Sequence, residues 1–261
     1  MKKLILTLLI AVVALVNVQS LKADDFSDAI VKSKKKLKEA ADKNDGKALL
    51  KVRGDFERIL QLKKNEWLVN YYLAVCDFWM TYTLMDMTDP TKTDNKQIQK
   101  YTESALDLLN KSTDSKEDFA EAWGLKLGVQ SNRWMYEPGK MNDIIAKMSE
   151  ATDMCKKYDP ENPRYLLIEA INTYYTPEAF GGGVDKALPM LEKSYKSFET
   201  YKPMDETYPN WGKETAAGMI ALCYSKQDKK DEAKKWYDKA LEINPDSGFI
   251  KNYIKSEMEK K

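Results

Sequence analysis

The chain has 261 residues, and its 42 basic residues nearly balance its 41 acidic ones, so its composition is that of a globular protein with almost no net charge. It contains no histidine, which excludes Ser-His-Asp and Cys-His catalysis, imidazole zinc sites and histidine pH switches. The near-neutral charge argues against a nucleic-acid-binding protein, because such proteins depend on a basic surface.

The N-terminus has the pattern of a Sec-type signal peptide. Lys2 and Lys3 precede an apolar run from Leu4 to about Val16, and small residues that suit a cleavage site follow. A membrane anchor is the alternative, but roughly 13 apolar residues are fewer than the ~20 that span a bilayer. No cysteine lies near the cleavage region to carry a lipid. We therefore expect residues 1–20 to be cleaved and the protein to be exported to the periplasm or the medium.

Residues 21–261 are expected to form a single all-α domain. Glycine and proline are sparse and cluster between segments with helical periodicity, and no strand-type alternation is present. Successive antiparallel helix pairs, each with a broad apolar face, stack into a solenoid. We expect about five such pairs and a last helix that caps the array. The predicted helices cover residues 25–42, 46–63, 66–87, 95–111, 116–133, 140–157, 163–175, 184–199, 211–226, 229–242 and 247–259.

The predicted helix 66–87 is the most apolar segment of the mature chain. Between Trp67 and Met85 its only charged residue is Asp77, which argues against a membrane span because it would cost about 2.5–3.5 kcal/mol at a bilayer centre. An inner helix packed between its neighbours is the simplest interpretation. The alternative is that one stripe of the helix faces a concave groove, where tyrosine offers contact area at low entropic cost. That stripe consists of Leu68, Tyr71, Val75, Phe78 and Tyr82.

A glycine-rich connection follows the predicted helix 163–175. Tyr174, Tyr175 and Phe180 precede three consecutive glycines at 181–183. Such glycines could aim backbone N–H groups at an anion, but no Lys-Ser/Thr pair follows in P-loop spacing. A tight turn that closes around Phe180 is the simplest interpretation. The alternative is that the three aromatic residues form one lip of a binding site.

The cysteines and carboxylates suggest structural roles. Cys76, Cys155 and Cys223 are odd in number and lie in apolar helical contexts, so we expect buried free thiols. Acidic pairs such as Glu117 and Glu121 lie on predicted amphipathic helices, where charges usually form solvated faces. We therefore expect no metal site, no cofactor and no catalytic residue.

The C-terminal helix pair has a recognisable motif. Small side chains at Ala221 and Ala233 would let the two helices approach closely, and Pro245 would end the second helix. Residues 214–247 resemble a tetratricopeptide repeat, although Ala217 stands where that family usually has a large aromatic residue. The matching positions are Ile220, Ala221, Tyr224, Ala233, Tyr237, Ala240 and Pro245. Upstream, the resemblance is limited to the pairing of helices.

The resemblance implies a function in binding. Tetratricopeptide repeat proteins generally bind peptides or protein segments in the concave groove, so we expect a non-catalytic scaffold or adaptor with a protein or peptide partner in the cell envelope. A solute-binding accessory component of a periplasmic transport system is the alternative. An enzyme is not expected, because no nucleophile–base pair is visible.

Overall fold

The computed structural model describes residues 23–85 and 90–260, and within these ranges the chain is all-α without strands. The predicted signal peptide lies outside the described residues. The α-helices are α2 Ala23–Asp42, α3 Gly46–Leu60, α4 Glu66–Leu84, α5 Asn95–Ser115, α6 Ala120–Ser131, α7 Met141–Tyr158, α8 Pro163–Tyr175, α9 Val184–Thr200, α10 Lys213–Lys226, α11 Lys230–Ile243 and α12 Lys255–Glu259. Short 3-10 turns are η1 Pro90–Lys92, η2 Asn132–Met135, η3 Pro138–Lys140 and η4 Glu178–Phe180, and η5 Phe249–Ile254 is a π-helix.

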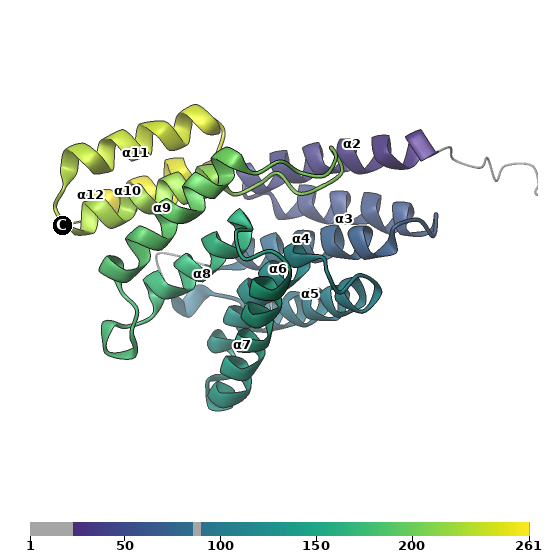
Figure 1. Cartoon of the computed structure of the whole chain (residues 1–261), viewed down its shortest axis with the longest axis horizontal. Coiled ribbons are helices and arrows are strands. Elements are labelled where there is room, and N and C mark those ends of the chain that lie inside the picture. The colour runs from purple at the N-terminus through teal and green to yellow at the C-terminus, as the bar shows by residue number, and fades with distance from the viewer. Residues whose placement is uncertain (1–22, 86–89, 261) are drawn as a thin grey trace, which may run out of the picture.

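Consecutive helices pack in antiparallel pairs, as the sequence predicts. The pairs are α2 with α3, α4 with α5, α6 with α7, α8 with α9, and α10 with α11, and η5 continues into α12 at the end (Figure 1). The pairs follow one another through contacts of α3 with α4, α5 with α6, α6 with α8, and α9 with α10. The predicted all-α solenoid of about five helix pairs with a C-terminal cap is confirmed.

The two helices of a pair differ in the share of their residues that is buried. In α6 every residue from Ala120 to Gln130 is buried, and α4, α8 and α10 are similarly enclosed. In α11, by contrast, only Ala233 and Ala240 are buried. These two alanines lie seven residues apart, so they share one face of the helix. The first helix of each later pair therefore forms the inner layer, and its partner covers it from outside.

The repeat motif at the C-terminus packs as its sequence predicts. The smaller apolar signature residues Ile220, Ala221, Ala233 and Ala240 are all buried. Tyr224 and Tyr237 pack against the same core cluster from its edge. Pro245 comes two residues after the end of α11, consistent with its inability to continue a helix.

The first and last parts of the described chain meet. The side-chain amide of Asn244, just after α11, donates to the Asp42 carboxylate at the end of α2, at 2.8 Å. Gly248 lies so close that a Cβ atom there would be 2.5 Å from the Asp42 carbonyl oxygen. In Figure 1 the ends of α2 and α11 accordingly lie next to each other. The first and last helix pairs of the described chain are therefore in direct contact at this point.

Candidate functional site

Four of the five side chains in the predicted groove stripe lie in the core. Leu68, Tyr71, Val75 and Phe78 are each at most 6% exposed, whereas Tyr82 is 38% exposed. The prediction that this stripe faces an open groove is therefore wrong for those four residues. The alternative, an inner helix enclosed by its neighbours, agrees with their burial. The reason is that another part of the chain covers this face of α4.

The covering segment is residues 201–212, the connection between α9 and α10, which we call the strap. In Figure 1 it extends from α9 toward α2 and returns to α10. The Trp211 indole N–H donates to the Tyr71 hydroxyl at 3.1 Å. The Tyr72 hydroxyl in turn donates to the Thr207 carbonyl at 2.5 Å. The strap thus binds directly to the inner face of α4.

The strap is also held from α2 and by aromatic contacts. The Lys34 ammonium of α2 donates to the Glu206 carbonyl at 2.6 Å and to the Tyr208 carbonyl. Burial lowers the pKa of Lys34 to about 8. The ring of Tyr208 packs edge-on against Trp67 and Phe119, with centroid distances of 6.0 and 5.8 Å. These contacts fix the strap between the first and third helix pairs.

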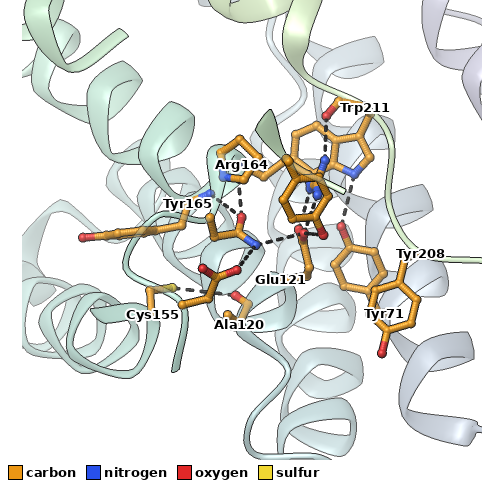
Figure 2. A network of polar contacts seen from close by, with 12 residues as sticks. Tyr71, Ala120, Glu121, Cys155, Arg164, Tyr165, Tyr208 and Trp211 are labelled. Atoms are coloured by element: carbon orange, nitrogen blue, oxygen red, sulfur yellow. Dashed lines mark hydrogen bonds and ion pairs between the residues drawn. The ribbon is translucent and has the colours of Figure 1, made fainter. Parts of the chain in front are cut away.

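A buried ion pair lies where the strap crosses α6 and α8 (Figure 2). Arg164 and Glu121 are 2% and 4% exposed, and Arg164 Nε donates to Glu121 Oε2 at 2.5 Å. Glu121 Oε1 also accepts from the Asn162 amide and the Tyr201 hydroxyl, both at 3.0 Å. The guanidinium Nη1 donates to the Trp211 carbonyl at 3.3 Å, and the Tyr201 ring lies 4.6 Å from its carbon. The network therefore joins α6, α8 and both ends of the strap.

The expectation that Glu121 lies on a solvated face is wrong. Burial alone would lower the pKa of Arg164, but the adjacent Glu121 carboxylate raises it above its ordinary value, so the guanidinium stays charged. Asp77 of α4 is likewise buried, and it is held by Arg53 at 2.7 Å and Ser104 at 2.6 Å. Burial raises the pKa of Asp77. Each of these carboxylates is satisfied by partners within the protein, which indicates a structural role.

A second aromatic group reaches the surface, and we call Tyr82, Tyr174, Tyr175 and Tyr253 the tyrosine cluster. The hydroxyls of Tyr175 and Tyr253 lie 2.6 Å apart, and Tyr175 is 56% exposed. Tyr174 packs edge-on against Tyr175 at a centroid distance of 5.0 Å. Burial and then the neighbouring Tyr253 raise the pKa of Tyr82 to about 12. Side chains of α4, α8 and η5, far apart in sequence, thus meet at one surface.

The glycine connection is a tight turn, and its backbone N–H groups donate hydrogen bonds within the turn itself. The amides of residues 181–183 all donate to carbonyls within residues 173–178, so they are not free to bind an anion. Gly181 and Gly183 have φ of +86° and +95°, a conformation that favours glycine. Phe180 is 81% exposed. The prediction that the turn closes around Phe180 is therefore wrong, and its ring projects beyond α8 into solvent.

Substituting Gly182 by alanine is expected to destabilise the fold. A Cβ atom there would lie 2.2 Å from the Thr176 carbonyl oxygen and 2.6 Å from that of Thr173, and backbone atoms cannot move aside cheaply. We expect Gly182→Ala to lower the free energy of unfolding by about 2–3 kcal/mol. Gly139 is the matched control, because a Cβ atom added there would meet no atom within 4 Å. Gly139→Ala should change the free energy of unfolding by less than about 0.5 kcal/mol, and equal effects in urea denaturation would contradict this account.

The three cysteines are buried free thiols, as expected. Burial raises the pKa of Cys223 to about 12 and also raises the pKa values of Cys76 and Cys155. Since the thiolate is the reactive form, these side chains serve as small apolar residues. Across the described residues, no group of three or more histidine, cysteine or acidic side chains is arranged to hold a metal ion. None of the described helices combines the length and apolarity that a membrane crossing requires.

Comparison with known proteins agrees with the fold. The tetratricopeptide repeat family matches residues 218–247, inside the segment in which the motif is visible by eye. No curated protein sequence matches the chain. Among solved structures, the HusA haemophore from Porphyromonas gingivalis is similar, with a TM-score of 0.62 and 24% identity over 78% of this chain and 93% of that one. At this identity the likeness establishes a shared helical fold.

Proposed function

We propose that this chain is a non-catalytic exported protein that binds a protein or peptide partner and acts as an adaptor in the cell envelope. Tetratricopeptide repeats mediate protein interactions, and the chain carries one such repeat at its C-terminus. The N-terminal pattern of two lysines and an apolar run supports export. A scaffold of stacked helix pairs suits this role, because a rigid receptor loses little conformational entropy on binding.

The observation that carries the proposal is the exposure of aromatic side chains at one end of α8. Phe180 and Tyr175 are 81% and 56% exposed, and Tyr82 of the tyrosine cluster is 38% exposed. Fully covering a large apolar side chain contributes about 1.5–3 kcal/mol, which is the largest contribution expected from each ring. Exposed aromatic residues of this kind are typical anchors of protein interfaces. The buried Phe78 of the predicted stripe instead packs against Tyr82, at a ring-centroid distance of 5.2 Å.

The test is to remove the two most exposed rings. We expect Tyr175→Ala with Phe180→Ala to weaken partner binding at least tenfold, because both rings would be desolvated in the complex, while the helical circular dichroism stays unchanged. The matched control is Met141→Ala with Ile145→Ala, which removes two side chains of similar exposure, 54% and 52%, from α7. Cross-linked capture from the cell envelope identifies the partner, and titration of the purified pair measures affinity. Equal binding by both double variants would exclude this surface.

A second candidate is binding of a planar solute of the porphyrin class, which would make the chain a solute carrier. Two observations favour it: the similar solved structure is a haemophore, and the tyrosine cluster presents two hydroxyls 2.6 Å apart at the surface. In a chain without histidine, a tyrosine oxygen is an available iron ligand.

Haemin titration separates this candidate from the first. If the tyrosine cluster binds haem, the Soret band of haemin should shift when the protein is added. Tyr175→Phe with Tyr253→Phe should weaken haemin binding at least tenfold, because it removes both hydroxyls. Tyr224→Phe, which removes a hydroxyl bonded to Glu192, is the control and should leave affinity unchanged. If the Soret band does not shift in the presence of the unaltered protein, haem binding is excluded and binding of a protein partner remains the proposed function.

A further inference from the structure

The strap contacts the array in the way that a bound peptide would. Its partners are Lys34 of α2, Tyr72 of α4, Glu121 of α6 and Arg164 of α8, which are the first helices of four successive pairs. Residues 201–212 form no α-helix. The strap doubles back through a turn at residues 205–208, and its returning part, residues 208–212, lies over the face of α4 that the sequence marks as a groove (Figure 1).

The chemistry of these contacts is also that of peptide recognition. Side chains of Lys34, Tyr72 and Arg164 donate to four backbone carbonyls of the strap, so these bonds do not depend on the strap's side chains. Specificity comes from two aromatic residues three positions apart. Tyr208 packs against Trp67 and Phe119, while the Trp211 ring lies 6.2 Å from that of Trp79. Backbone bonds for affinity and side-chain contacts for specificity are the usual division in extended peptide recognition.

We propose that the strap is an internal ligand, and that the face it covers is a receptor for an extended segment with the pattern Tyr-Pro-X-Trp. A partner segment of this chemistry would compete with the strap. The proposal shares with the proposed function only the premise that the chain binds proteins. It concerns a surface other than the tyrosine cluster, so the two can fail separately.

The covalent attachment of the strap determines how strongly it competes with a free partner segment. A short connection holds its ligand at an effective concentration of about 1 mM. If the free segment binds the vacated face with a Kd of about 10 µM, the face is occupied roughly a hundred times more often than it is free. A competing segment then binds the intact chain about 100-fold more weakly than a chain without the strap.

The experiment supplies the strap as a separate molecule. Residues 202–211 are replaced by a Gly-Ser linker of equal length, and a fluorescent peptide with the sequence of residues 202–211 is titrated into the altered and the unaltered chain. We expect capture by the altered chain at micromolar concentration and about 100-fold weaker capture by the unaltered one. A control peptide with alanine at the positions of Tyr208 and Trp211 should bind neither. The proposal would be refuted if the altered chain is helical but does not bind the peptide, or if it binds the control peptide equally well.

A second variant decides the matter if the altered chain does not fold. Tyr208→Ala with Trp211→Ala in the chain removes the two aromatic contacts of the strap and leaves every residue of the face that it covers unchanged. Because the strap would be held less firmly while the face keeps its donors, this variant should capture the unaltered peptide at least tenfold more tightly than the unaltered chain does. Capture no tighter than that of the unaltered chain would overturn the proposal.

Discussion

Glu121→Ala is expected to lower the free energy of unfolding by about 3–5 kcal/mol, because it breaks a buried ion pair from one side and leaves an uncompensated charge in the interior. The substitution leaves the Arg164 guanidinium, which is 2% exposed, without a counter-charge. It also removes the acceptor for Asn162 and Tyr201. The loss should therefore exceed that of Gly182→Ala.

Two further variants make this prediction specific. Glu117, in the turn before α6, pairs with Lys157 at 3.5 Å and is 60% exposed, so Glu117→Ala should leave the free energy of unfolding nearly unchanged. Glu121→Leu with Arg164→Met should recover most of the loss, because replacing both partners by apolar side chains leaves no buried charge. Urea denaturation followed by circular dichroism measures all three. Similar losses for Glu117→Ala and Glu121→Ala would show that the ion pair does not contribute as described.

Stability is expected to fall steeply above pH 10. Burial raises the pKa values of Tyr71 and Tyr72 well above the ordinary value of 10. The unfolded chain therefore loses these protons near pH 10 while the folded chain keeps them, and the unfolded state binds fewer protons. Linkage then requires stability to decrease with rising pH, by about 1.4 kcal/mol per unit for each tyrosine, or about 2.7 for both.

Lys34 acts in the opposite direction at lower pH. Its pKa is lowered to about 8 in the folded state from 10.5, so the unfolded chain binds more protons between these values and the Lys34 contribution to stability rises with pH. Above pH 10.5 this contribution is constant. Lys34 therefore does not contribute to the change of the urea midpoint between pH 10.5 and 11.5, where the slope reports the buried tyrosines and the buried thiols. Tyr71→Phe with Tyr72→Phe should flatten the slope, and an unchanged slope would mean that other groups cause the loss.

The sequence alone predicts the helices well because the signals for them are local. Apolar periodicity and Gly/Pro punctuation place α2 to α11 within about four residues, and small residues such as Ala221 and Ala233 identify the last repeat. The predicted helix 247–259 covers the π-helix η5 together with α12. The signal peptide stays a prediction. These features depend on neighbours within one or two helices, so a single sequence contains them.

The strap and the ion pair could not be predicted in this way, because their partners are distant. Trp211 is 140 residues from Tyr71, and Arg164 is 43 from Glu121. The strap has no periodicity that would distinguish it from an exposed loop. The sequence does contain one signal for the burial of Glu121. It sits in the run Ala120-Glu-Ala-Trp123, where every neighbour is apolar, and such a run favours an enclosed position over a solvated face.

The contact between Asp42 and the segment of Asn244 and Gly248 changes how the array responds to shortening. In an open repeat protein each unit touches only its neighbours, so units can be removed from an end and the remainder still folds. Here deletion of the last helix pair would remove the contacts that Asn244 and Gly248 make with Asp42, and deletion of the first pair would remove the same contacts from the other side. Shortening the array from either end is therefore expected to cost more stability than the contacts between neighbouring repeats alone would predict.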